Sequence, residues 1–227
     1  MAQNDPKFHS GHRERLRQKF MDNKLAEYEK LEMLLGYVVP RRDVRPLAHA
    51  LLKKFGNLSQ VLTAPYETLI AFPGVGNSIA IFLKLINEII LDGYRNTLVA
   101  CPIFHNHEVL QNYCKWELAS KPVEEFHVLY LDAEHRLIKD EAHSVGTFNS
   151  SSVYVREIVK HALDLNALNI VLVHNHPAAD SNFSSEDIET TEILQKLFRD
   201  LDITLVDHIL VGPFSLASAK AKGLIHN

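Results

Sequence analysis

Cysteines and long apolar segments are scarce in this 227-residue sequence. Its two cysteines, Cys101 and Cys114, are too few for a disulfide framework and too far apart for a Cys-x-x-Cys metal or redox pair. No apolar run reaches the roughly 18 residues of a membrane span, and segment 1–20 is polar and basic where a signal peptide has an apolar core. We therefore expect a globular cytoplasmic protein with no membrane partner.

Several catalytic motifs are also missing. The sequence has no Gly-x-Ser-x-Gly turn to expose a nucleophilic serine, and no lysine follows the glycines of segment 73–78 as it would in a P-loop. The Pro-Cys-x-x-Cys motif that zinc nucleobase deaminases require is absent as well. These absences argue against serine hydrolases of the elbow type, P-loop nucleotide enzymes and nucleobase deaminases.

The net charge of −4 conceals an asymmetry between the two halves of the chain. Residues 1–100 carry 14 Lys and Arg against 10 Asp and Glu, a balance of +4, whereas residues 101–227 carry 10 against 18, a balance of −8. A basic N-terminal part can meet an anionic partner, although a solvated basic helix is the more common explanation. The split favours two domains.

Hydrophobic patterning changes near residue 100. Apolar residues recur at helical spacing from Gly11 to Leu91, with turn signals between the segments, which predicts an all-α domain over residues 1–98. Further along, strand and helix patterns alternate, beginning with two strands joined by a turn at Ala133 to His135. We expect an α/β domain over residues 99–227, with a mixed sheet flanked by helices.

Two histidines, His174 and His176, stand at the end of an apolar run. On a strand they point to the same side, so both imidazoles can meet one ion. Ser184 suits the N-cap of the following helix and places Asp187 in its first turn. Three such ligands would leave the fourth position of a tetrahedral zinc open for water, as in hydrolytic sites. The alternative is that the histidines end a sheet edge and Asp187 only favours the helix dipole.

The complete pattern His-x-His, seven residues, Ser-x-x-Asp resembles the JAMM (MPN-type) metallopeptidase motif. In addition, the segments EEFHVLYLDAEHRLI, VHNHP and VDHILVG resemble the RadC family, and the likeness extends over nearly all of residues 100–227. This resemblance implies a JAMM fold, related in shape to the cytidine deaminases, with one Zn²⁺ per chain. The implied zinc ligands are His174, His176 and Asp187.

The resemblance also implies a glutamate general base just before an apolar strand. Glu124 occupies that place because Phe126 sets the register of the family's Glu-x-Phe pattern, with Glu125 and Glu141 as competitors. In the family mechanism zinc lowers the pKa of a water, the glutamate accepts its proton, and the amide of a peptide or isopeptide is attacked. Ser184 would help to hold the oxyanion, so this serine has two candidate roles, capping and catalysis.

Two departures from the RadC pattern concern the surroundings of the site. Segment Pro177–Phe183 keeps the length of the family's Pro-Ser-Gly-Asp-Pro-x-Pro loop but loses its glycine and two prolines. Tyr154 stands where the family has a histidine. We expect the altered loop to affect rigidity and substrate fit and to leave metal binding intact.

Other histidines are predicted to have no catalytic role. The sequence His105-Asn106-His107 has no Ser-x-x-Asp behind it, so we interpret Asn106 as a helix cap and both histidines as surface residues. His208 lies in a strand pattern and is expected to be a structural histidine and not a fourth ligand.

The glycines of segment Phe72–Ala80 suggest a second activity. They allow a tight turn between helices with backbone N–H groups exposed, a geometry suited to phosphate, and the segment resembles a helix-hairpin-helix motif. A plain helical turn or a hairpin for protein contacts is the alternative. The rival functional hypothesis is a DNA-associated repair or recombination protein whose metal domain is a nuclease or an inactive scaffold. The candidate DNA contacts are Gly74, Val75 and Gly76, with phosphate contacts from Arg41, Arg42, Arg45, Lys53 and Lys54.

Overall fold

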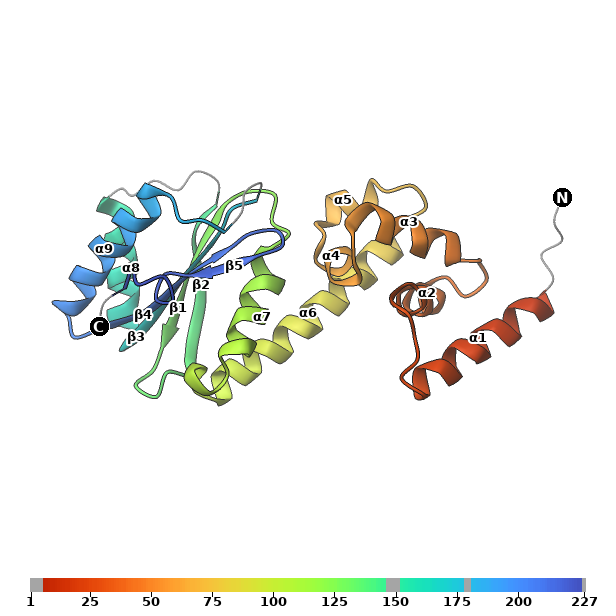
Figure 1. Cartoon of the computed structure of the whole chain (residues 1–227), viewed down its shortest axis with the longest axis horizontal. Helices are drawn as coiled ribbons and strands as arrows, with labels where there is room; N and C mark the ends of the chain where they lie inside the picture. The colour runs from red at the N-terminus through yellow and green to blue at the C-terminus, as the bar shows by residue number, and fades with distance from the viewer. Residues whose placement is uncertain (1–5, 146–151, 178–180, 226–227) are drawn as a thin grey trace. The chain divides into compact units, whose positions relative to one another are not determined.

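The computed structural model describes residues 6–145, 152–177 and 181–225 (Figure 1). The chain divides into two compact units, Met1–Asn87 and Glu88–Asn227. This division falls inside the long helix α6, Asn77–Ala100, which also contains residue 98, the boundary expected from the sequence. The polar segment around Gly93 does not end the helix, because Leu91 and Leu98 stand two turns apart and are both buried in one core.

The first unit is helical, as predicted. Its core is built from leucines that recur at helical spacing, among them Leu31 and Leu35 of the second helix, which are fully buried. Short helices are separated by turns, and the Asn57 side chain caps one of them by accepting the N–H of Gln60. The helices before α6 are α1 (Pro6–Met21), α2 (Glu27–Val38), α3 (Arg45–Phe55), α4 (Leu58–Thr63) and α5 (Tyr66–Ile70).

The second unit contains a five-stranded mixed sheet of order β2-β1-β3-β4-β5, which confirms the predicted fold class. Strand β1 is antiparallel to both of its neighbours, β3 and β4 are parallel, and β5 is antiparallel to β4. The predicted turn at Ala133 to His135 joins β1 to β2. The strands are β1 (Glu125–Leu131), β2 (Leu137–Val145), β3 (Asn169–Asn175), β4 (Thr204–Val211) and β5 (Leu216–Ser218).

Helices cover both faces of this sheet (Figure 1). Alternate residues of β1 point to opposite faces, so Leu129 packs with α7 and Val128 packs with α8 and α9. Both cores are built from buried apolar side chains, so the sheet is packed on both of its faces. The helices of this unit are η1 (Ile103–His105), α7 (His107–Leu118), α8 (Ser152–Asp164) and α9 (Ser185–Arg199).

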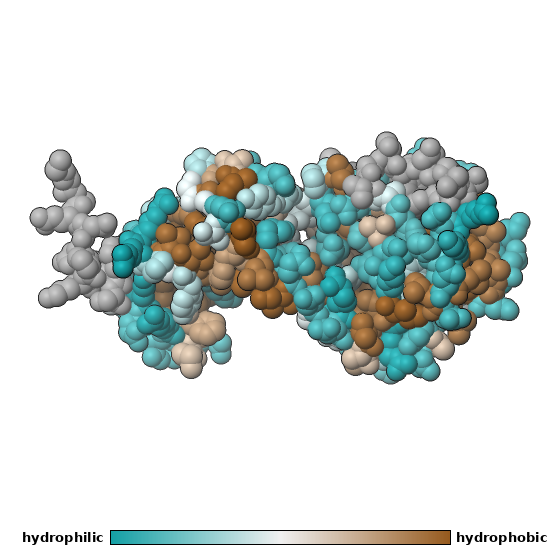
Figure 2. Space-filling view, turned by 180° about the vertical axis from the view of Figure 1, so that it is seen from behind, coloured by the Kyte–Doolittle hydropathy of each residue, from teal (hydrophilic) through white to brown (hydrophobic). Residues whose placement is uncertain are grey.

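Apolar side chains are exposed in both units, among them Ile81, Leu85 and Ile89 of α6. In Figure 2 hydrophilic side chains cover much of the visible face of the second unit, with smaller apolar groups between them. Within the described ranges, no helix combines the length and the hydropathy that crossing a bilayer would require. His105 and His107 are exposed, as expected, and Asn106 occupies the N-cap position of α7, although its side chain makes no capping hydrogen bond.

Candidate metal centre

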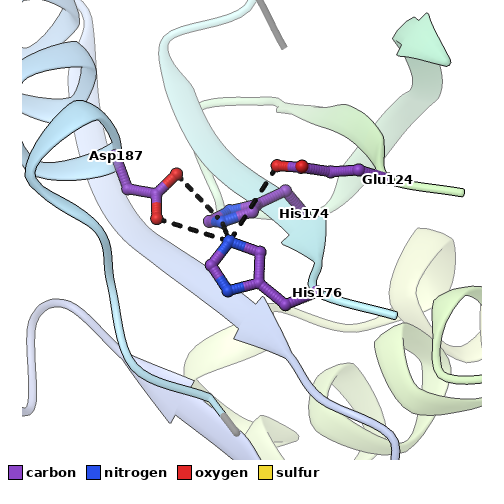
Figure 3. Close-up of side chains that lie close together, drawn as sticks. All are labelled: Glu124, His174, His176 and Asp187. Atoms are coloured by element: carbon purple, nitrogen blue, oxygen red, sulfur yellow. Dashed lines mark hydrogen bonds and ion pairs between the residues drawn. The ribbon is translucent and has the colours of Figure 1, made fainter. Parts of the chain in front are cut away.

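The end of strand β3 brings two imidazoles together. His174 belongs to the strand, and His176 lies just beyond it, where its backbone N–H donates to the carbonyl of Val211 in β4 at 3.0 Å. This bond extends the strand geometry by one residue, so both side chains point to the same side. Their Nε2 atoms lie 3.2 Å apart, as the His-x-His spacing predicts (Figure 3).

The N-terminus of α9 supplies a carboxylate. The Ser184 hydroxyl oxygen accepts the N–H of Asp187 at 3.1 Å, and the Ser184 N–H donates to Asp187 Oδ2 at 2.7 Å, which forms a capping box. The box fixes Asp187 with Oδ1 3.2 Å from His174 Nε2 and Oδ2 3.5 Å from His176 Nε2. The capping role predicted for Ser184 is confirmed, and its catalytic role stays a prediction.

Asp187 is only 4% exposed, yet its surroundings favour the ionised form. Burial alone would raise the pKa of this carboxyl, but the hydrogen bond and charge of His174, with the N–H of Ser184, hold the pKa well below its ordinary value. Asp187 is therefore an anionic oxygen donor over the pH range in which proteins are usually studied.

A fourth side chain, Glu124, approaches from the residue before β1. Its Oε1 lies 3.9 Å from His176 Nε2, and the side chain is 30% exposed. The competing glutamates are engaged elsewhere, since Glu125 contacts Lys121 at 3.0 Å and Glu141 contacts a histidine of α8. The cluster contains one ligand atom from each of four residues, all within 4.8 Å of one another (Figure 3): Glu124, His174, His176 and Asp187.

Asn175, which the sequence analysis did not single out, positions this glutamate. Its side-chain oxygen accepts the N–H of Glu125 at 2.8 Å, and its amide nitrogen donates to the carbonyl of Val123 at 3.1 Å. Both neighbours of Glu124 are thus tied to the strand that carries the histidines. The sequence did offer a signal for Asn175, which stands between two histidines at the end of an apolar strand. A buried amide at such a place requires hydrogen-bond partners of its own.

A hydrogen-bonded chain behind the site fixes the histidine tautomers. Thr191 donates its hydroxyl proton to the carbonyl of Asp187 at 2.6 Å, so at 2.7 Å it accepts from Nδ1–H of His208. The Nε2 of His208 then accepts Nδ1–H of His174 at 2.8 Å. Because Nδ1 of His174 is committed as a donor, Nε2, which faces Asp187 and His176, is the nitrogen left to coordinate a metal ion.

His208 is therefore a structural histidine, as predicted from the sequence. It is fully buried, and burial lowers its pKa well below the ordinary value, which keeps the ring neutral. The ring of Phe183 packs against it with centroids 5.2 Å apart. Thr191 lies at the other end of this series of hydrogen bonds, and no feature of the sequence distinguished it.

The donor set fits a zinc ion. Two imidazole nitrogens and one anionic carboxylate oxygen are typical zinc ligands, and their convergence suits a divalent cation. A more exposed carboxylate, that of Glu124, lies beside them.

The altered loop is described in part. Ala178 to Asp180 lie outside the described residues, as does the side chain of Tyr154. Beyond them, the Ser181 hydroxyl donates to Ser215 Oγ at 2.9 Å, and Phe183 covers the inner side of His174 with ring centroids 6.1 Å apart. The second half of the loop is therefore anchored next to the first metal-ligand candidate.

The glycine turn of the first unit connects α5 to α6. Gly74 has φ +92°, a left-handed conformation that favours glycine, and Gly74 and Gly76 are exposed. A Cβ at Gly74 would lie 3.5 Å from a guanidinium nitrogen of Arg42. Val75 is 6% exposed, and its N–H donates to the carbonyl of Phe72 at 3.0 Å, so the N–H of this predicted contact is already bonded within the turn. Arg45 is paired with Asp43 at 2.7 Å.

Comparison with known proteins agrees with this fold. The family described as the RadC-like JAB domain matches residues 104–224. The chain belongs to this family, as its sequence resemblance predicted. It is 38% identical over 229 residues to the UPF0758 protein FN0909 of Fusobacterium nucleatum, covering 96% of this chain and 99% of that protein. It is also 38% identical over 223 residues to the UPF0758 protein SPO0054 of Ruegeria pomeroyi, covering 97% and 100%.

Proposed function

We propose that this protein is a zinc-dependent hydrolase of the JAMM type that cleaves a peptide or isopeptide bond. The observation that carries the proposal is the convergence of His174, His176 and Asp187, with Glu124 beside them. One Zn²⁺ per chain would be held by the first three residues. When bound, it would supply Lewis acidity for the attacking water and the scissile carbonyl.

The side chains around the metal then have separate tasks. Glu124 takes the proton of the attacking water at a carboxylate oxygen and returns it to the leaving amine as the carbon–nitrogen bond breaks. The Ser184 oxygen accepts an N–H of its own helix, which leaves its hydroxyl proton to donate to the developing oxyanion. Asn175 keeps the backbone on both sides of Glu124 in place.

The test compares Glu124→Gln with wild type in zinc content and in cleavage of a peptide and isopeptide library. We expect cleavage to fall by about 100-fold or more, because general base catalysis contributes on this scale, with zinc content unchanged. Glu186→Gln, an exposed glutamate in the first turn of α9, is the matched control and should retain full cleavage. Equal cleavage by wild type and Glu124→Gln would reject the proposal.

A second candidate function rests on the α5–α6 turn. The guanidinium of Arg42 lies beside Gly74, so the exposed backbone of Gly74 and Gly76 and a cation share one surface, which suits a DNA phosphate. In this reading the protein acts in repair or recombination, and the metal unit is a nuclease or an inactive scaffold. Salt-dependent DNA binding that weakens in Arg42→Ala but not in Lys30→Ala would favour it.

A further inference from the structure

A second group of side chains that could bind a metal ion lies in the second unit. It shares no residue with the metal centre described above. One ligand atom from each of Glu141, His143 and His161 lies within 4.8 Å of the others. Glu141 and His143 belong to β2, and His161 belongs to α8. No step of the proposed hydrolysis uses these residues.

Strand geometry explains how the first two residues meet. They are two positions apart in β2, so their side chains share one side of the strand. The register with β1 shifts here, since His127 pairs with Ala142 and Phe126 pairs with Ser144, which makes His143 the extra residue of a bulge. Bulges at sheet edges redirect side chains, and β2 is one of the two edge strands of this sheet.

The carboxylate of Glu141 has two separate tasks. Its Oε1 contacts Lys139 Nζ at 3.0 Å, on the solvent side. Its Oε2 lies 2.7 Å from His161 Nδ1 and 3.9 Å from His143 Nε2, between two rings whose centroids are 5.4 Å apart. One oxygen therefore faces two imidazoles.

These separations are close to those of a zinc site. Metal–ligand bonds of 2.0 to 2.2 Å in tetrahedral geometry place ligand atoms about 3.4 Å apart. The observed 2.7 Å and 3.9 Å lie on either side of that value, and the ligand nitrogens of His143 and His161 lie within 4.8 Å of each other. Tyr130 donates or accepts at His143 Nε2 over 2.7 Å, and a cation at that nitrogen would take the place of its hydroxyl.

The degree of exposure is also suitable for a metal that exchanges with solvent. The side chain of His143 is 5% exposed, whereas those of Glu141 and His161 are 23% and 29% exposed. The buried His143 is thus held by the core, whereas the partly exposed Glu141 and His161 can be reached from solvent. A simple ion pair between Glu141 and His161 would not require His143 to converge on the same oxygen.

We propose that Glu141, His143 and His161 form a second site for a divalent transition metal of the zinc class. Two imidazoles and one carboxylate are a zinc donor set, and three protein ligands leave a position for water. A bound ion links α8 to the edge strand β2, so it stabilises the second unit in proportion to its occupancy.

The experiment titrates Zn²⁺ alone into the full-length, chelator-stripped chain against a chromophoric competitor, with thermal unfolding recorded in parallel. His161→Gln removes the outer ligand but keeps a donor for Glu141, so it retains the helix-to-strand hydrogen bond. His107→Gln, an exposed histidine of α7, is the matched control. His176→Ala disables the first centre by itself.

We expect wild type and His107→Gln to bind a second equivalent that His161→Gln lacks. Loss of even an outer-shell partner costs about 10- to 100-fold in metal affinity, so loss of a ligand should weaken this equivalent by at least about 100-fold. His176→Ala should keep the second equivalent and lose only the first. The proposal is overturned if folded His161→Gln binds as much Zn²⁺ as wild type. If instead His176→Ala loses no zinc, the first centre fails and this proposal stands.

Discussion

His174 donates Nδ1–H to Nε2 of the buried His208 over 2.8 Å. This contact couples a candidate metal ligand on β3 to a neutral histidine on β4, and Thr191 of α9 completes the chain. It commits Nδ1 of His174 as a donor and leaves Nε2, which lies 3.2 Å from Asp187 Oδ1, as the nitrogen that can coordinate a metal ion. Metal affinity should therefore depend on a residue that does not touch the metal.

Replacement of His208 tests this dependence. We expect His208→Leu to weaken Zn²⁺ binding at the first centre by about 10- to 100-fold, because the His174 ring loses its acceptor and its fixed tautomer. His208→Gln offers an amide oxygen to the same Nδ1–H and should weaken binding less. Chelator competition measures both, with circular dichroism to show that the variants fold. If folded His208→Leu bound Zn²⁺ as tightly as wild type, the hydrogen bonds through His208 would have no role in metal binding.

Asn175 should affect catalysis without affecting zinc. Asn175→Ala leaves the N–H of Glu125 and the carbonyl of Val123 without partners, at a cost of about 1 to 3 kcal/mol in the free energy of unfolding. Cleavage should fall because the backbone around Glu124 loosens, while zinc content stays at the wild-type level. Urea unfolding, zinc analysis and kinetics separate the three effects. A parallel loss of zinc would show that Asn175 supports the ligands and not the base.

The two roles of Ser184 can be separated by glycine. At an N-cap, glycine in place of serine costs only a few tenths of a kcal/mol, whereas alanine costs about 1 kcal/mol. Ser184→Gly therefore keeps most of the stability of α9 and removes the hydroxyl. If the Ser184 hydroxyl stabilises the oxyanion, kcat should fall by about 100-fold in Ser184→Gly and in Ser184→Ala alike. Full activity in Ser184→Gly would assign the residue to capping alone.

The low pKa of Asp187 predicts acid sensitivity. A carboxyl whose folded pKa is depressed contributes stability above its unfolded pKa, near 4, and this contribution is lost as pH falls through the folded pKa. With a chelator present, the free energy of unfolding of the wild type should fall more steeply below about pH 5 than that of Asp187→Asn. Chemical unfolding at several pH values measures the two slopes. Identical slopes would show that Asp187 is not selectively stabilised as an anion.

The sequence predicted the parts of the site that depend on local geometry. The spacing of His174 and His176 acts within one strand, and Ser184 with Asp187 acts within one helical turn. Glu124 was found by family resemblance, since no local rule distinguishes it from Glu125. Its proximity to the histidines comes from the antiparallel pairing of β1 with β3.

Residues that act through pairing of distant elements were not predictable. The contact between His174 and His208 depends on the register of β3 against β4, and the cluster of Glu141 with His161 depends on the packing of α8 beside an edge strand. The full length of α6 was not predicted for a similar reason. The helical pattern was followed only as far as Leu91, and the core position of Leu98 is decided by packing.

Zinc analysis of His174→Ala tests the central claim most directly. Wild type, His174→Ala and the exposed control His107→Ala are loaded with Zn²⁺, dialysed and measured for zinc per folded chain. The account predicts that His174→Ala loses one equivalent and all cleavage, whereas His107→Ala retains both. A folded His174→Ala protein with the zinc content of wild type would contradict it.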